Sequence, residues 1–160
     1  MNIFNSSIIQ KPVYKQGKSL KNNSIYITGM FSISTSFALL MWISANSFVY
    51  LPFTPVPITM QTLTVLLSGI VLKKTWAVFA QIEYILLGLL GLPVFAGFKN
   101  GITAITGPTG GYIIGFVFAA FITGYTYERF EMKSYQIDKS IPIFFSCLSG
   151  LSLIYISGYI

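Results

Sequence analysis

Glu83 is the first residue that suggests chemistry, because a carboxylic acid is rare in a stretch as apolar as the one around it. It lies midway along the apolar run from Trp76 to Leu90, where an ionised carboxylate costs a few kcal/mol unless it faces a partner or a cavity. Glu83 could therefore accept hydrogen bonds from a polar ligand. The alternative is a structural hydrogen bond with Gln61, Gln81 or a hydroxyl group.

Lys99 is a second candidate. It is the one charged residue in the glycine- and proline-rich passage GLPVFAGFKNGITAITGPTGGYIIGF, residues 91–116. An anionic ligand such as a carboxylate could bind there, or the lysine could contribute only to membrane topology. The GPTGG part of the passage is not a phosphate-binding P-loop, since that motif requires a Lys followed by Ser or Thr after its glycines.

The composition argues against several kinds of chemistry. The chain has no histidine and a single cysteine, Cys147, so we expect no disulfide, no zinc or haem site and no other cofactor. It also has neither paired carboxylates nor an arrangement that would activate a nucleophile, which argues against an enzyme. We expect Cys147 to be a small buried apolar residue.

The composition as a whole is that of a membrane protein. Hydrophobic residues make up 54% of the chain and charged residues 9%, and the mean hydropathy is +0.71, whereas about a quarter of the residues in a soluble domain are charged. The 160 residues have room for about five spans of roughly 20 residues each. We therefore predict an all-α membrane protein with one bundle of about five transmembrane helices.

The apolar runs predict the elements that position the candidate residues. Residues 1–24 are polar and basic, do not resemble a cleavable signal, and are predicted to be a loose cytoplasmic tail. Residues 25–160 form the predicted transmembrane domain. Its helices are expected at about 25–49, 58–72, 76–90, 110–127 and 141–160. A tight turn with Thr75 as the N-cap and a charged loop over residues 128–139 complete the predicted connections.

Two loops interrupt the apolar sequence with helix-breaking residues. They are LPFTPVP (51–57), with three prolines, and GLPVFAG (91–97). The helices between these loops are about 15 residues or 22 Å long, against a hydrocarbon core of about 30 Å, so we expect both loops to reach into the membrane. Irregular backbone is tolerated there only in protein or beside a cavity, and such shortened spans are typical of a transporter's ligand site. Two ordinary surface loops are the alternative.

The basic residues indicate which side of the membrane the loops occupy. Nine of the ten lysines and arginines fall in segments on one side, and only Lys99 falls on the other. Because basic residues favour the cytoplasmic side, the N-terminus is predicted to be cytoplasmic and both loops are predicted to share the outer face. The net charge of +6 reflects this bias rather than a nucleic-acid partner.

Small residues recur at four-residue spacing on two predicted helices, which lets another helix approach closely. One such stripe, expected to pack within the chain, comprises Gly111, Gly115, Ala119 and Thr123. On the first helix, Ser34 and Ala38 have the same spacing, which is a weak motif by itself.

Three blocks of this sequence resemble the signature blocks of the BioY family, the biotin-specific substrate-binding subunits of energy-coupling-factor transporters. The blocks are PFTPVPITMQTL (52–63), GLLGLPVFAG (88–97) and GPTGGYIIGF (107–116). The resemblance extends over about residues 31–128. Three blocks in matching order and spacing make it specific.

The resemblance implies a six-helix S subunit without catalytic activity that captures biotin from outside, with its outer loops closing over the ligand. It also implies partners, namely a transmembrane coupling subunit and two cytoplasmic ATPase subunits, in a bacterial cell membrane. Biotin suits the predicted loops, since Phe53, Phe95 and Phe98 could contact its apolar rings and Lys99 could meet its carboxylate.

The resemblance further suggests the residues of each site. Small residues of the family's first helix dock the coupling subunit, and Ser34 with Ala38 is similar to its AxxxA pattern. The candidate ligand-binding residues lie in the three blocks or near them. They are Phe53, Thr54, Gln61, Glu83, Tyr84, Phe95, Gly97, Lys99, Thr109 and Gly110.

The sequence departs from the family at its end. The family continues into a sixth helix with a Pro-Gly-Asp-x-x-Lys-like segment that contributes to biotin binding, whereas this sequence ends at Ile160. We therefore expect either a truncated sequence or a protein that has lost part of its site. The alternatives to biotin uptake are a degenerate paralogue with weak or no binding and an S subunit for another vitamin.

Overall fold

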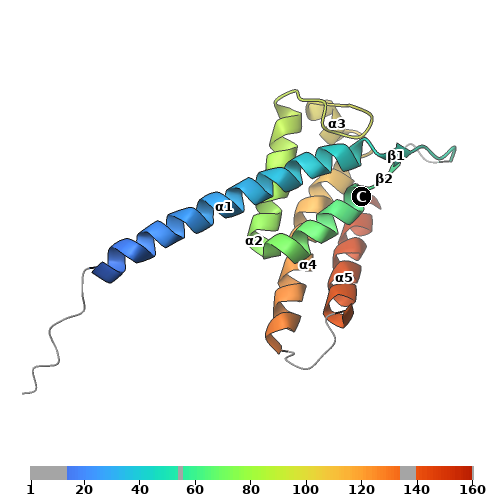
Figure 1. Ribbon diagram of the computed structural model, residues 1–160. Helices are drawn as coiled ribbons and strands as arrows, with labels where there is room; N and C mark the ends of the chain where they lie inside the picture. Colours follow the sequence, from blue (N-terminus) through green and yellow to red (C-terminus); the bar gives the residue numbers. More distant parts are fainter. Residues whose placement is uncertain (1–13, 54–55, 134–139, 160) are drawn as a thin grey trace, which may run out of the picture.

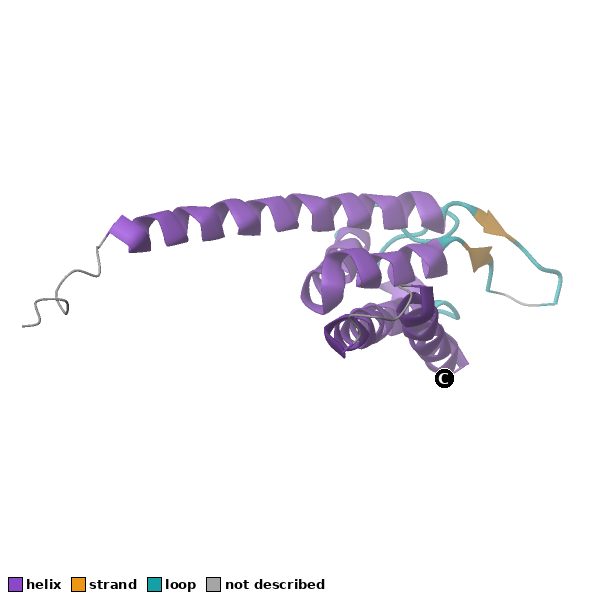
Figure 2. Cartoon of the chain, turned by 60° about the horizontal axis from the view of Figure 1, so that its bottom comes forward, coloured by secondary structure: helices purple, strands orange, loops and turns teal. Residues whose placement is uncertain are grey.

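The order of helices follows the apolar runs of the sequence. The computed structural model describes residues 14–53, 56–133 and 140–159. Their elements are α1 (Tyr14–Ala45), β1 (Phe48–Val49), β2 (Ile58–Thr59), α2 (Gln61–Leu89), α3 (Ile102–Thr106), α4 (Gly110–Lys133) and α5 (Ser140–Tyr159). Helix α4 packs against both α2 and α5, and α1 packs along α2 (Figure 1). Figure 2 shows the N-terminal part of α1 extending beyond the other helices.

Four helices among the described residues are long and apolar enough to cross a membrane. By length and composition, these spans are Ser24–Ala45, Gln61–Leu89, Gly110–Glu131 and Ser140–Tyr159. Their outward faces carry many exposed Leu, Ile and Phe side chains, as expected for helices that are apolar all round and surrounded by lipid. The predicted all-α membrane bundle is confirmed.

A sharp bend in α2 explains why five spans were predicted. Lys73, inside this helix, has φ 63° and ψ 174°, a backbone conformation that favours glycine. The two arms of α2 on either side of Lys73 correspond to the helices predicted at 58–72 and 76–90, and in Figure 1 they leave the bend in different directions. Thr75 lies within the second arm, so its predicted role as an N-cap is wrong.

Contacts with the end of α4 hold this bend. The Lys74 ammonium group lies 3.0 Å from the Glu128 carboxylate, and the Lys74 backbone N–H donates to the same carboxylate over 3.3 Å. Gly124 allows the two backbones to meet, since a Cβ there would collide with the Lys74 nitrogen. Residues 128–133 of the predicted charged loop instead continue α4 to Lys133, and residues 134–139 of that loop lie outside the described residues.

The two ends of α1 also differ from the prediction. It begins at Tyr14, within the segment predicted as a loose tail, because the Lys, Gln, Ser and Leu residues there continue a helix at little cost. Residues 1–13 lie outside the described residues. Helix α1 ends at Ala45 rather than residue 49, because Phe48–Val49 pair antiparallel with Ile58–Thr59. The same pairing delays the start of α2.

The stripe of small residues packs α4 against α5, as predicted. A Cβ on Gly111 would collide with the carbonyl oxygen of Ser157, and one on Gly115 with the Ser157 hydroxyl. Further along, a Cβ on Gly150 of α5 would collide with Thr123 of the stripe. Close approach of backbones is how helices gain packing energy in lipid. The stripe is therefore covered by α5 of the same chain.

Candidate functional site

A cavity of about 310 Å³ lies at the end of the bundle where α4 begins. Residues of the β1–β2 hairpin, of α2, of the loop between α2 and α3 (residues 90–101, called the glycine-rich loop below), of α4 and of α5 form its wall. They are Val56, Pro57, Ile58, Thr59, Gln61, Thr62, Tyr84, Ala96, Thr109, Tyr112, Ile113, Phe116 and Tyr155. The volume falls at the lower end of the range of about 300–1,000 Å³ for small-molecule sites. We call this space the main cavity.

The lining of the main cavity combines apolar surface with uncharged polar groups. Tyrosine and phenylalanine rings and aliphatic side chains make up most of it, and threonine and tyrosine hydroxyls and one amide supply hydrogen bonds. None of the described residues that line it is charged. Such a wall suits a ligand with an apolar body and a neutral polar head.

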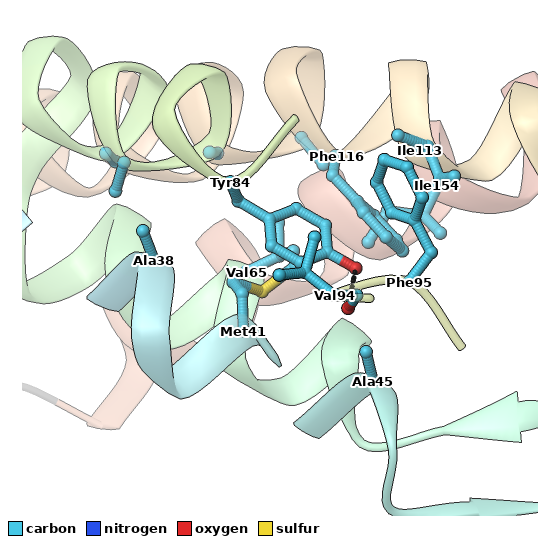
Figure 3. Close-up of a cluster of buried hydrophobic side chains, with 14 of the residues drawn as sticks. Ala38, Met41, Ala45, Val65, Tyr84, Val94, Phe95, Ile113, Phe116 and Ile154 are labelled. Atoms are coloured by element: carbon cyan, nitrogen blue, oxygen red, sulfur yellow. Dashed lines mark hydrogen bonds between the residues drawn. The ribbon is translucent and has the colours of Figure 1, made fainter. Parts of the chain in front are cut away.

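Tyr84 is the centre of a row of hydrogen bonds within this wall. Its side chain is completely buried, and its hydroxyl accepts from Gln61 Nε2 over 2.7 Å and donates to the Val94 carbonyl over 3.0 Å. Figure 3 shows the Tyr84 ring among the core side chains, with Phe95 beside it. The Thr59 hydroxyl donates to Gln61 Oε1 over 3.1 Å. These hydrogen bonds thus join the hairpin, both arms of α2 and the glycine-rich loop.

Helix α1 and the residue that follows it, Asn46, hold the glycine-rich loop from the other side. The indole Nε1 of Trp42 donates to the Pro93 carbonyl over 3.0 Å, and the Phe98 N–H donates to Asn46 Oδ1 over the same distance. Within the loop, the Phe95 N–H donates to the Lys99 carbonyl over 3.0 Å. These bonds satisfy backbone groups that the irregular chain would otherwise leave unpaired.

Three of the predicted ligand-binding residues line the main cavity, namely Gln61, Tyr84 and Thr109. Phe95 and Gly110 support it from behind. The Phe95 ring is buried edge-on against Tyr84, with ring centres 5.5 Å apart, and Gly110 leaves room for the backbone of Ile105. The two loops predicted to share one face of the protein do line one cavity.

Other predicted ligand-binding residues lie elsewhere. Phe53 is 81% exposed in the loop of the hairpin, so it does not contact the main cavity in this conformation. Gly97 turns the loop with φ +73° near Tyr50, and Lys99 lines a different hollow. Thr54 lies outside the described residues.

Glu83 has the structural hydrogen bond that was the alternative to ligand binding. Its Oε1 accepts from the Thr35 hydroxyl of α1 over 3.0 Å, and it is not among the residues that line the main cavity. Its Oε2 is buried and has no hydrogen-bond partner among the described residues. Glu83 therefore joins α2 to α1.

Replacing Thr35 by valine is expected to destabilise the folded protein by about 1–3 kcal/mol, because the half-buried Glu83 carboxyl group loses its hydrogen-bond partner. Thermal unfolding in detergent measures this loss. Thr28→Val is the matched control, since among the described residues the Thr28 hydroxyl bonds only to the Ser24 carbonyl of its own helix. Equal unfolding temperatures for the two variants would contradict the role of Thr35.

Ser34 and Ala38 are both completely buried within the chain. The Ser34 hydroxyl donates to the Trp76 carbonyl of α2 over 3.1 Å. The pair therefore packs α1 against α2 and is not presented to a partner subunit in this conformation, contrary to the expected docking role. Cys147, expected to be buried, is only half-buried on α5.

The structure adds several lining residues that were not predicted. Tyr112, Ile113 and Phe116 continue the face of α4 that begins at Thr109, and their three- and four-residue spacing is the signal that could have revealed them. Thr59 and Thr62 flank Gln61, a predicted residue. Tyr155 lies far away in the sequence and stacks edge-on with Tyr112 at 6.4 Å, so only the fold brings it to the site.

The sequence is similar to a family of known transporters. A family model with the description BioY family matches residues 18–160. The biotin transporter BioY of Thermotoga maritima is 39% identical over 116 residues, which cover 72% of this chain and 64% of that protein. The probable biotin transporter BioY of Pyrococcus horikoshii is 41% identical over 105 residues, 66% of this chain and 57% of that protein. This chain thus spans less than two thirds of these relatives.

One solved structure has a similar fold. It is the crystal structure of the S-component for biotin from an ECF-type ABC transporter, with a TM-score of 0.72 and 24% sequence identity. The match covers 83% of this chain and 70% of that chain. At this level of identity the similarity concerns the arrangement of helices.

Proposed function

The chain belongs to the BioY family, and from this premise we propose that it binds biotin in the main cavity, as the substrate-capturing subunit of an energy-coupling-factor transporter. The observation that carries the proposal is the position of that cavity. Its wall is built from parts of all three sequence blocks that resemble the family, and it contains no described charge.

The chemistry of biotin supports this assignment. Its fused rings offer apolar surface to Ile113 and Phe116, and its ureido group offers N–H donors and a carbonyl acceptor to neutral partners such as Gln61 and Thr109. A neutral polar head is bound best where hydroxyl and amide groups converge in an otherwise apolar pocket. The proposal involves no chemical conversion of the ligand, so the protein acts by binding alone.

The hairpin gives the ligand a way in. Pro57, Ile58 and Thr59 form part of the cavity wall, and β1 and β2 are only two residues each. Displacing a wall held by so short a ladder costs little, because few backbone hydrogen bonds must break. In this proposal the hairpin faces the outside of a bacterial cell membrane, and the N-terminus is cytoplasmic.

Transport requires partners in this proposal. The chain would associate with a transmembrane coupling subunit and two cytoplasmic ATPase subunits, which supply the energy. The end of the bundle at Lys73 carries the basic and acidic side chains of the α2 bend and of α4. Basic residues favour the cytoplasmic side, which supports placing this end toward the ATPases.

Calorimetric titration of the purified wild-type chain with biotin in detergent is expected to give a saturable heat signal. The Thr62→Phe variant is expected to bind biotin roughly tenfold more weakly or worse. Thr62 lines the main cavity and is half-buried, so a larger side chain there would take up ligand space. Leu63→Phe is the matched control, because Leu63 is exposed on the surface of the bundle and does not line the main cavity. Absence of a saturable signal with the wild type would rule out the proposed function.

A further inference from the structure

A second hollow of about 400 Å³ lies next to the main cavity. Residues of the glycine-rich loop, of α3 and of the turn before α4 line it. They are Phe98, Lys99, Asn100, Thr103, Ala104, Gly107, Pro108 and Thr109. Thr109 lines both spaces, so it marks the point at which they adjoin. The two hollows differ in charge, since only this second hollow has a described charged residue in its wall.

Lys99 brings a positive charge to this hollow that no described residue neutralises. It forms no ion pair with any described residue, and the described acids lie elsewhere. Glu83 bonds to Thr35 on α1, and Glu128 and Glu131 pair with the lysines at the α2 bend. An anion that enters this hollow therefore meets a cation without competition from a neighbouring carboxylate.

The backbone on each side of Lys99 is held in place. Its carbonyl accepts from the Phe95 N–H over 3.0 Å, and the next residue, Asn100, donates from Nδ2 to the Gly91 carbonyl over 3.0 Å. Phe98 on the other side is held by Asn46, the residue that follows α1. A residue whose backbone is already ordered gives up less freedom when a ligand binds, which improves affinity.

We propose that the second hollow is a subsite for the carboxylate end of the ligand, with Lys99 as the residue that requires a free carboxylate. The inference rests on the proposed function, because it assumes that the rings of biotin occupy the main cavity. The uncharged wall of the main cavity offers nothing to a carboxylate. A flexible carbon chain that passes Thr109 would carry that group out of the main cavity and toward the Lys99 ammonium.

This arrangement makes the protein selective for the free acid. A ligand with the same rings and chain but an esterified or amide-linked end keeps its contacts in the main cavity and loses the attraction of Lys99. Hydrogen bonds between charged groups contribute more than those between neutral groups. We expect the free acid to bind roughly tenfold to a hundredfold more tightly than its neutral ester.

The test compares biotin with biotin methyl ester on the purified full chain by calorimetry in detergent. Wild type should prefer biotin over the ester, whereas Lys99→Gln should bind both with about the affinity that the wild type has for the ester. Lys99→Arg should keep the preference, because it keeps the charge. Raising the salt concentration should reduce the preference of the wild type.

Arg129→Gln is the control, since it removes an exposed positive charge of α4 whose guanidinium contacts Tyr125, and it should leave the preference unchanged. Equal affinity of the wild type for biotin and its ester would overturn the Lys99 assignment and leave biotin binding intact. So would an unchanged preference in Lys99→Gln. A wild type that binds neither compound would overturn the proposed function and this inference together.

Discussion

The Tyr84→Phe variant is expected to bind biotin at least tenfold more weakly than the wild type and to unfold at a lower temperature. The lost hydroxyl group leaves the Gln61 amide and the Val94 carbonyl without their shared partner. A buried polar group that loses its partner costs about 1–3 kcal/mol, and two such groups are affected. The loss of ligand affinity follows because Gln61 and Tyr84 both line the main cavity.

Calorimetry with biotin and thermal unfolding in detergent measure the two effects of Tyr84→Phe separately. Tyr26→Phe is a suitable control, since the Tyr26 side chain is exposed on α1 and its hydroxyl has no hydrogen bond to any described residue. If both variants unfold at the same temperature and bind biotin equally well, the hydrogen bonds that connect Thr59, Gln61, Tyr84 and Val94 do not hold the site together.

The Gly111→Val variant is expected to lose the native bundle almost completely. A side chain at Gly111 collides with the backbone of Ser157, and a backbone atom cannot rotate away as a flexible side chain can. Overpacking typically costs about 1–3 kcal/mol and more where the backbone must shift, and here it separates α4 from α5 beside Tyr112 and Tyr155. Biotin binding should be lost together with the fold.

Size-exclusion chromatography after detergent extraction tests this expectation, with aggregation or degradation of Gly111→Val as the predicted outcome. Gly29→Val is the matched control, because a Cβ at Gly29 meets no atom within 4 Å. A monodisperse Gly111→Val protein that unfolds at the wild-type temperature would show that α4 and α5 can separate without loss of structure.

The sequence blocks predicted which segments surround the main cavity. Prolines and glycines mark where helices end, so both loops around the main cavity were visible from residue types alone. Gln61, Tyr84 and Thr109 were identified because they lie in or next to these blocks, and the structure brings them to one cavity. Lipid simplifies such predictions, since the backbone of a span must form a helix or part of a closed β-barrel.

The orientation of individual side chains was less predictable, because it depends on how helices rotate against each other. Ser34 and Ala38 were expected to face a partner, yet they lie on the face of α1 that packs against α2. Glu83 was left between ligand and structural roles, and the deciding neighbour, Thr35, is 48 residues away in the sequence. Small and polar residues carry no signal that says which helix they will meet.

The bend in α2 was only partly predictable. A break near Lys73 follows from the polar KKT sequence, but no residue type there favours a positive φ. The pairing with Glu128 and the close approach at Gly124 stabilise the bend, and both contacts come from α4. This feature is therefore set by tertiary packing against a helix some 50 residues later in the sequence.

The bend also has a mechanical consequence. In a straight helix, Gln61 and Tyr84 would be separated by about 35 Å, yet their side chains share a hydrogen bond of 2.7 Å. Helix α2 therefore consists of two arms of roughly 17 Å each, which are joined by a hinge at Lys73 and meet again at their far ends. A rotation of a few degrees at this hinge would move the ends of the two arms apart far enough to break the hydrogen bond between Gln61 and Tyr84. The shape of the main cavity, which both arms line, thus depends on the ion pairs that fix the angle of the bend at the other end of the bundle.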